Sequence, residues 1–185
     1  MPTGTCAPET RLQKNQSSGE HPLRVCFVCT GNTCRSPMAA AVANHLAHSA
    51  SSSLPEELRH LIPPPIEAYS AGLFAKSGEP ISENAVKALE EAGILPDPAR
   101  DYHRHTAHCL QAEEAERYDL LVGITSSHAA ALLMQFPGLS ERITCMPESI
   151  ADPFGGDLET YRASLADITK GVTQLFFPEY SHDKD

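Results

Sequence analysis

Short apolar runs alternate with longer segments of mixed polarity along most of this chain. Four short runs are mostly apolar, as buried strands are, at residues 23–28, 66–70, 120–124 and 143–146. Segments with helical spacing or composition lie between and after them, at 37–46, 82–92, 111–116, 127–136 and 158–175. Strands that alternate with helices predict an α/β domain with a parallel sheet and helices on both faces. Ligands bind at the carboxyl edge of such sheets.

The most informative stretch lies between the first strand and the first helix. It reads Cys-Thr-Gly-Asn-Thr-Cys-Arg-Ser-Pro from Cys29 to Pro37. Backbone N–H groups in such a loop converge on one point, and the helix dipole adds positive potential there. Gly31 and Asn32 tolerate the positive φ that curls successive N–H groups into an anion nest. We therefore predict a phosphate-binding loop made of Thr30, Gly31, Asn32, Thr33, Cys34 and Arg35.

Two side chains give this loop candidate chemistry. The guanidinium of Arg35 is a planar fork that fits two phosphoryl oxygens. The positive loop favours the thiolate of Cys29, and a thiolate beneath a bound phosphate is a nucleophile toward phosphorus. Ser36 could donate a hydrogen bond to this sulfur and help it leave. A cysteine after a strand is often a small core residue, but the combined strand, Gly-Asn turn, Arg-Ser-Pro and helix favours catalytic roles for Cys29 and Arg35.

Residues 29–39 resemble the signature of the low-molecular-weight protein tyrosine phosphatases, and more narrowly that of the protein arginine phosphatase branch. Residues 152–157, Asp-Pro-Phe-Gly-Gly-Asp, resemble the acid loop of the same family. Residues 70–72 and 103–105 resemble its connecting segments, so the resemblance covers roughly residues 23–175. It implies a doubly wound, flavodoxin-like sheet of four parallel strands in the order 2-1-3-4, with helices on both faces.

The resemblance also implies a reaction. It is metal-independent hydrolysis of phosphorylated protein side chains through a phosphocysteine on Cys29, without a cofactor. Asp152 would protonate the leaving group and then deprotonate the attacking water, although an Asp before Pro is by itself a common turn residue. Asn32 and Ser36 would hold the loop in shape. In this family a cysteine at the position of Cys34 can form a reversible disulfide with the nucleophile, so redox control is a hypothesis.

Substrate choice points to two residues. Tyrosine-acting relatives usually carry a larger aliphatic residue where this chain has Thr33, whereas arginine-acting relatives carry threonine. A smaller polar side chain would leave room for a guanidinium, and Asp152 could hold that cation by a charge-assisted bond. Phe154 would stack on the substrate, or would simply pack its own loop. We therefore expect phosphoarginine in proteins as the substrate, with phosphotyrosine as the alternative.

Composition adds limits on partners and organisation. The chain has 185 residues and a net charge of −10, which argues against nucleic acid and anionic membranes as partners. The sequence has no run of 18 apolar residues and no signal-peptide core. Three of its six cysteines lie within residues 26–34, too close to pair across a fold, so we expect a reduced, cytoplasmic protein. We expect a disordered leader at 1–22, one domain at 23–177 with a surface insertion at 49–65, and a flexible tail at 178–185. The sequence does not indicate an oligomeric state.

The sequence offers several alternative interpretations of its site residues and its function. His103, His105, His108 and Cys109 do not follow a standard zinc spacing, so no metal site is predicted. Phe74 could line the mouth of the site or belong to the core. An arsenate reductase would share the loop, but such enzymes carry a cysteine pair after the third strand, and residues 124–136 contain none. A non-catalytic phosphate-binding module is the remaining alternative.

Overall fold

A four-stranded parallel sheet in the order β2-β1-β3-β4 forms the centre of the fold. The structure is a computed structural model and describes residues 21–52 and 65–178. The strands are β1 (Leu23–Cys29), β2 (Ile66–Gly72), β3 (Leu120–Gly123) and β4 (Ile143–Cys145). Their order and direction confirm the predicted fold class.

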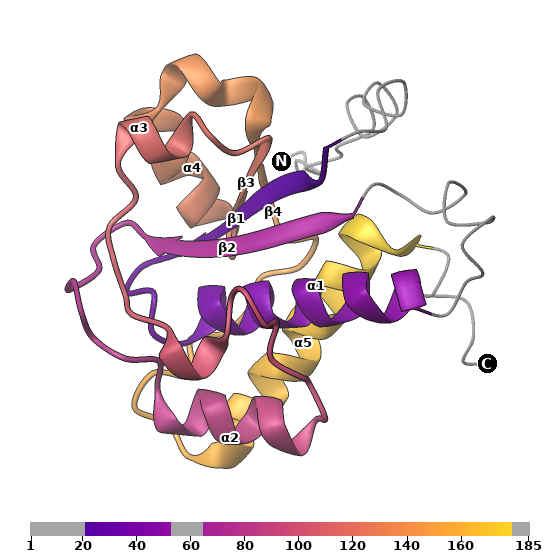
Figure 1. Ribbon diagram of the computed structural model, residues 1–185. Helices are drawn as coiled ribbons and strands as arrows, with labels where there is room; N and C mark the ends of the chain where they lie inside the picture. The colour runs from indigo at the N-terminus through magenta and orange to yellow at the C-terminus, as the bar shows by residue number, and fades with distance from the viewer. Residues whose placement is uncertain (1–20, 53–64, 179–185) are drawn as a thin grey trace, which may run out of the picture.

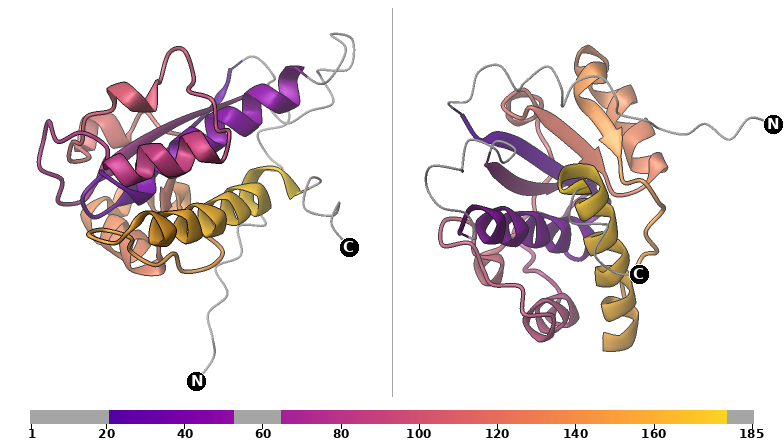
Figure 2. Two further views of the ribbon diagram at one scale, coloured as in Figure 1. Left: turned by 90° about the horizontal axis from the view of Figure 1, so that it is seen from below. Right: turned by 90° about the vertical axis from the view of Figure 1, so that its right-hand side faces the viewer.

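Helices cover both faces of this sheet. Helices α1 (Arg35–Ser52), α2 (Glu83–Glu91) and α5 (Leu158–Phe176) lie on one side, and α3 (Ala112–Ala115) and α4 (Ser126–Gln135) lie on the other (Figure 1). Two short 3₁₀ helices, η3 (Tyr102–Arg104) and η4 (Pro137–Arg142), complete the described elements. Figure 2 shows α1 and α5 next to each other beneath the sheet, with α2 beside them.

The hydrophobic core is divided between the two faces of the sheet. Along β1, Val25 and Phe27 belong to the cluster on the side of α1 and α5, whereas Cys26 and Val28 belong to the cluster with Leu121 and Leu132. All four side chains on β1 are fully buried. Successive side chains of a strand point to opposite faces, which explains why β1 is apolar at every position from Val25 to Cys29 and does not alternate with polar residues.

The first helix runs further than predicted. We expected a surface insertion from residue 49 to residue 65, but α1 continues to Ser52, so the first four residues of the expected insertion are helical. The Pro65 carbonyl accepts a hydrogen bond from the N–H of Leu23 at the start of β1, at 2.8 Å. The rest of the expected insertion up to residue 64, the leader up to residue 20 and the tail from residue 179 lie outside the described residues.

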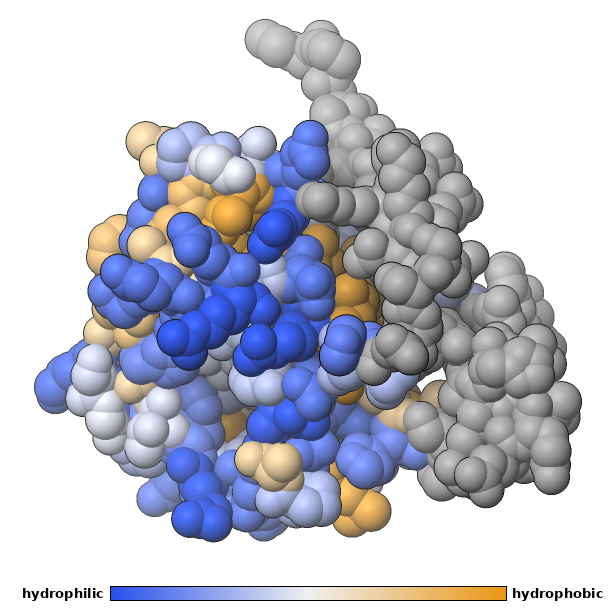
Figure 3. All heavy atoms as spheres, turned by 45° about the horizontal axis from the view of Figure 1, so that its top comes forward, coloured by the Kyte–Doolittle hydropathy of each residue, from blue (hydrophilic) through white to orange (hydrophobic). Residues whose placement is uncertain are grey.

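The face of the molecule in Figure 3 is largely hydrophilic, with small separate hydrophobic areas. Among the described residues, no helix is long and apolar enough to span a lipid bilayer.

Candidate active site

The loop at residues 29–35 joins the carboxyl end of β1 to α1, which begins at Arg35. The neighbouring segment after β2 holds its start, because Leu73 N–H donates to the Cys29 carbonyl and Phe74 N–H to the Thr30 carbonyl, both at 2.9 Å. Gly72 permits this approach: a Cβ atom there would lie 2.8 Å from the Thr30 carbonyl oxygen. The β1–β2 register, in which Cys29 lies opposite Gly72, therefore positions the loop.

Asn32 determines the shape of the loop. It is the non-glycine residue with positive φ, 56°, in the described chain, and its side chain is fully buried. Its Nδ2 donates to the hydroxyls of Ser36 and Ser70, each at 3.0 Å, and its Oδ1 accepts from the N–H of His108 at 3.1 Å. Its backbone carbonyl lies 2.8 Å from Nε2 of His105. These contacts hold a backbone conformation that most residues avoid.

Cys29 and Ser36 form a close pair inside the loop. The Cys29 sulfur lies 3.0 Å from the Ser36 hydroxyl and accepts a hydrogen bond from the Asn32 N–H at 3.3 Å. The Ser36 hydroxyl also lies 3.2 Å from the Ala71 carbonyl oxygen. It has a single hydrogen, so it can donate either to this carbonyl or to the sulfur. A thiolate on Cys29 would attract that donation.

Arg35 joins the loop to the segment that contains Asp152. Its side chain is buried, and its Nη2 lies 2.6 Å from Oδ2 of Asp152, whose side chain is 53% exposed. Its Nη1 contacts the carbonyl of Ile150 at 3.4 Å. Its Nε is buried and has no hydrogen-bond partner among the described residues. The motifs at 29–35 and 152–157, more than a hundred residues apart, therefore meet at one guanidinium.

Thr33 and Cys34 occupy different surroundings. Thr33 is partly exposed, and its carbonyl accepts from the N–H of Ser82 at 2.8 Å. Cys34 is buried, with its sulfur 3.2 Å from the Tyr161 hydroxyl and 3.4 Å from the Ser82 hydroxyl. Burial, and then the contact with Cys34, raise the pKa of Tyr161 to about 12. In this structure both cysteines of the predicted redox pair, Cys29 and Cys34, are free thiols.

Two aromatic side chains near the site are exposed. Phe74 follows directly on the segment that holds the loop and is 79% exposed, which excludes the core role considered for it. Phe154 is 76% exposed, and its N–H donates to Asp152 at 3.2 Å. Both rings are therefore largely accessible to solvent.

The histidines considered as a metal cluster serve other contacts. His103 pairs with Asp101 and Glu90, and His105 contacts the loop at Asn32. Within residues 21–52 and 65–178, no group of three or more His, Cys, Asp or Glu side chains could hold a metal ion.

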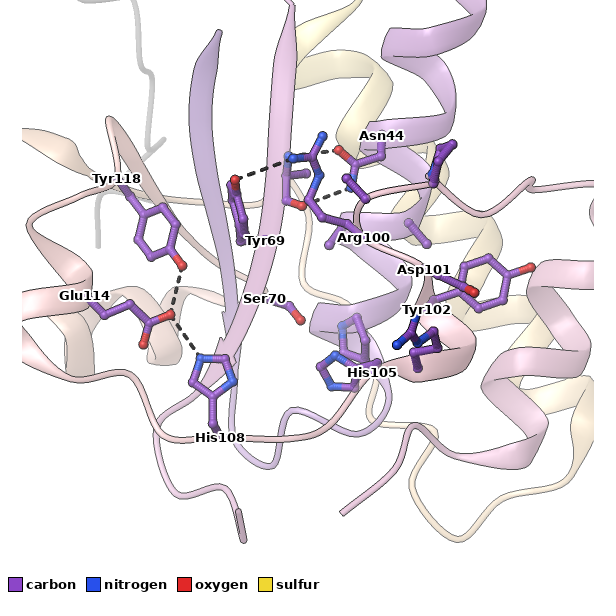
Figure 4. Close-up of a pocket in the computed structure, with 17 residues that line it drawn as sticks. Asn44, Tyr69, Ser70, Arg100, Asp101, Tyr102, His105, His108, Glu114 and Tyr118 are labelled. Atoms are coloured by element: carbon purple, nitrogen blue, oxygen red, sulfur yellow. Dashed lines mark hydrogen bonds and ion pairs between the residues drawn. The ribbon is translucent and has the colours of Figure 1, made fainter. Parts of the chain in front are cut away.

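A pocket of about 330 Å³ lies behind the loop, between β2, α1 and the segment from η3 to α3. Figure 4 shows His105, His108 and Ser70 along it, with Glu114 joined to both His108 and Tyr118. No residue of the loop from 29 to 35 lines this pocket, although two histidines that do line it, His105 and His108, also contact Asn32.

Sequence reasoning missed the residues that hold the loop from outside. Ser70 was seen only as part of a connecting segment, His105 as part of another and as a rejected metal ligand, and His128 was not considered. His128, at the start of α4, lies 3.0 Å from the Thr30 hydroxyl through its Nε2. The signal available in the sequence was the pair Thr125 and His128, three residues apart at a helix start, which forms a capping box.

The chain is similar to known proteins over most of its length. The family model described as low molecular weight phosphotyrosine protein phosphatase matches residues 24–184. A protein-arginine-phosphatase of Geobacillus stearothermophilus is 33% identical over 161 residues, which cover 83% of this chain and 94% of that protein. A low molecular weight protein-tyrosine-phosphatase, PtpB, of Staphylococcus haemolyticus is 31% identical over 159 residues, covering 83% and 97%.

A solved structure agrees with these sequence matches. It is the YwlE arginine phosphatase, a cysteine-to-serine mutant with a phosphorylated active-site serine. It has a TM-score of 0.69 and 27% sequence identity, and the match covers 88% of this chain and 98% of that one.

Proposed function

Because the chain belongs to the low molecular weight phosphotyrosine protein phosphatase family, we propose that Cys29, Arg35 and Asp152 form its active site and that its preferred substrate is phosphoarginine in proteins. The chain is a cysteine-dependent protein phosphatase. The observation that carries the assignment of residues is the ion pair of 2.6 Å between Arg35, in the loop that begins with Cys29, and Asp152. It brings a nucleophile, an anion-binding guanidinium and a carboxyl group around one point.

Phosphate binding would change the partners of Arg35. The guanidinium has an unpaired buried Nε and an Nη2 that Asp152 occupies in this structure. An unpaired buried donor costs free energy, and oxygens of a bound phosphoryl group would satisfy it. Competition of these oxygens for the guanidinium would release the carboxyl group of Asp152 toward the leaving group.

The first step would transfer the phosphoryl group to sulfur. The Cys29 thiolate attacks phosphorus, an S–P bond forms, and the bond from phosphorus to the substrate nitrogen or oxygen breaks. The electron pair of that bond goes to the leaving group, which takes a proton from Asp152. The loop N–H groups and Arg35 stabilise the equatorial oxygens.

The second step would regenerate the enzyme. Asp152, now a carboxylate, takes a proton from water, and the water oxygen attacks phosphorus. The S–P bond breaks and returns its electron pair to sulfur, so inorganic phosphate and the thiolate are released. The hydroxyl of Ser36, 3.0 Å from the sulfur, stabilises the thiolate as it leaves.

Support for phosphoarginine rests on the side chains around the loop. Thr33 is partly exposed and smaller than the aliphatic residue usual in tyrosine-acting relatives. The half-exposed carboxyl group of Asp152, in its protonated form, could give its proton to the departing nitrogen, and the resulting carboxylate could then hold the guanidinium product. The exposed ring of Phe154 could stack on the guanidinium plane. The relative named as an arginine phosphatase is consistent with this choice.

The test is kcat/KM on a phosphoarginine peptide and on the matching phosphotyrosine peptide, with Cys29→Ser as the inactive control. We expect a preference for phosphoarginine. A preference for phosphotyrosine would overturn the substrate choice and leave the mechanism intact. Absence of turnover with either peptide and with an aryl phosphate would point to a phosphate-binding module.

Two variants of Thr33 separate size from polarity. Thr33→Ile adds bulk and removes the hydroxyl, and we expect it to raise activity on phosphotyrosine relative to phosphoarginine. Thr33→Val removes the hydroxyl at nearly the same volume. A shift with isoleucine alone would show that size selects the substrate, and a shift with both would show that the hydroxyl does. An unchanged ratio in both variants would exclude Thr33 as the selecting residue.

A further inference from the structure

The contact between His128 and Thr30 joins the start of α4 to the first residue after Cys29. His128 is buried and Thr30 is exposed, and the distance from Nε2 to the threonine hydroxyl is 3.0 Å. The two residues are 98 positions apart in the chain. The proposed reaction assigns no role to this histidine.

The other ring nitrogen fixes which hydrogen bond the histidine makes. Nδ1 lies 3.2 Å from the backbone N of Thr125, which can only donate, so Nδ1 must accept. The Thr125 hydroxyl lies 2.9 Å from the same nitrogen and accepts from the backbone N–H of His128 in return. In the neutral ring the hydrogen is therefore on Nε2, and Nε2 donates to the hydroxyl of Thr30.

Other segments hold the remaining parts of the loop. The N–H groups of Leu73 and Phe74 hold its first two carbonyls, and the N–H of Ser82 holds the carbonyl of Thr33. His105 holds the carbonyl of Asn32. His128 is the contribution of the start of α4, and it contacts the side chain of Thr30, the residue that supplies the first N–H of the anion nest.

We propose that His128 is a positioning residue, which donates from Nε2 to the Thr30 hydroxyl and so keeps the first N–H of the phosphate loop directed at the bound phosphoryl group. The inference rests on the proposed phosphate-binding role of this loop. It gives the chain a second determinant of phosphate affinity outside the signature motif.

This arrangement works only with an uncharged ring. A proton on Nδ1 would face the N–H of Thr125, and two donors cannot share a hydrogen bond, so a charged ring would lose one of the two Thr125 contacts that orient it toward Thr30. Burial is the main cause that lowers the pKa of His128; the positive charge of Arg35 lowers it further, and Asp152 opposes this. Of the elements that pack against α4, β3 and β4 contribute no charged residue, and η4 contributes Glu141 and Arg142, neither of which is among the charges that shift this pKa. The ring is therefore neutral at neutral pH.

The test uses inorganic phosphate as a competitive inhibitor of aryl phosphate hydrolysis by the full chain. His128→Asn keeps an acceptor near the position of Nδ1, so the helix cap survives, but its shorter side chain cannot reach Thr30. Thr30→Val removes the hydroxyl from an exposed position and should leave folding unaffected. We expect each to raise the Ki for phosphate and the KM about five- to tenfold, with a smaller effect on kcat, because one hydrogen bond is lost. Thr30→Ser, which keeps the hydroxyl, should retain affinity close to that of the parent protein.

The double variant and the pH dependence distinguish positioning from a general structural role. If His128 acts through Thr30, the double variant binds phosphate as each single variant does. The ratio of the Ki of Thr30→Val to that of the parent should fall toward one in acid, as His128 becomes protonated. This ratio cancels the ionisation of phosphate and of Cys29. Three results would each overturn the proposal. They are a Ki in the double variant raised by the product of the two single effects, a ratio of Ki values that does not change with pH, and a Ki in His128→Asn equal to that of the parent protein.

Failure of the proposed function would look different. A parent protein that neither hydrolyses aryl phosphates nor binds inorganic phosphate would overturn both proposals. A parent protein that does both, with variants that do not couple, would overturn the role of His128 alone.

Discussion

Replacing Asn32 by alanine should weaken the fold at the base of the phosphate loop. The side chain makes three hydrogen bonds, to Ser36, Ser70 and the N–H of His108, and it is fully buried. At roughly 1 kcal/mol for each bond, their loss costs about 3 kcal/mol. Alanine at a φ of 56° adds about 1 kcal/mol of backbone strain. We therefore expect Asn32→Ala to lower the free energy of unfolding by about 4 kcal/mol.

Glycine at the same position separates the two contributions. Asn32→Gly loses the same hydrogen bonds but adopts positive φ without strain, although its greater freedom in the unfolded chain offsets part of this advantage. We expect it to be about 0.5–1 kcal/mol more stable than Asn32→Ala. Asn84→Ala is the matched control, because the Asn84 side chain donates one hydrogen bond, to the Gly156 carbonyl at 3.2 Å. This control should lose about 1 kcal/mol.

The assay is urea denaturation at neutral pH, with the slope m compared among the variants. Activity on an aryl phosphate should fall with stability in both Asn32 variants and remain near that of the parent in Asn84→Ala. A loss below about 1 kcal/mol in Asn32→Ala would refute the assigned hydrogen-bond contribution. Equal free energies of unfolding in Asn32→Ala and Asn32→Gly would refute the backbone strain assigned to alanine at this position.

Three further predictions concern residues of the site. Asp152→Asn should lower kcat about 10²- to 10⁴-fold on peptides and less on a substrate with a good leaving group. The free energy of unfolding should change by less than about 1 kcal/mol, because the carboxyl group is half exposed. Equal losses of kcat on both substrates would contradict the role of Asp152 as general acid. After peroxide treatment a thiol should restore activity to the parent but not to Cys34→Ala, and equal recovery would exclude Cys34 as the redox partner. Burial lowers the pKa of His128 in the folded protein below the ordinary histidine value of 6.5. As the pH falls, the unfolded chain therefore binds a proton at this histidine before the folded protein does, so the free energy of unfolding should fall between pH 7 and 5. Urea denaturation should show a smaller fall in His128→Asn, and an equal fall would contradict this assignment.

The sequence by itself determined the layers of the fold and the centre of the site. The run that became β1 is apolar from Val25 to Cys29 because both of its faces are buried there, and this pattern is local. The loop from Cys29 to Ser36 could also be predicted, because its main contacts, Cys29 with Ser36 and Asn32 with Ser36, join residues within seven positions of each other. Contacts between residues so close in the chain depend mainly on the local backbone, which the sequence pattern indicates. The motif that contains Asp152 was found through a family resemblance.

Only the tertiary structure decided which distant groups hold this loop. Ser70, His105 and His128 lie 38, 73 and 98 positions from their partners in the loop. Serine and histidine at such separations have no periodicity that marks them, since their contacts depend on strand register and on the placement of α4. The pairing of Cys29 with Gly72, and of Val28 with Gly123, brings these segments to the same edge of the sheet. Side-chain hydrogen bonds across that edge depend on distances of a few ångströms that a linear pattern does not encode.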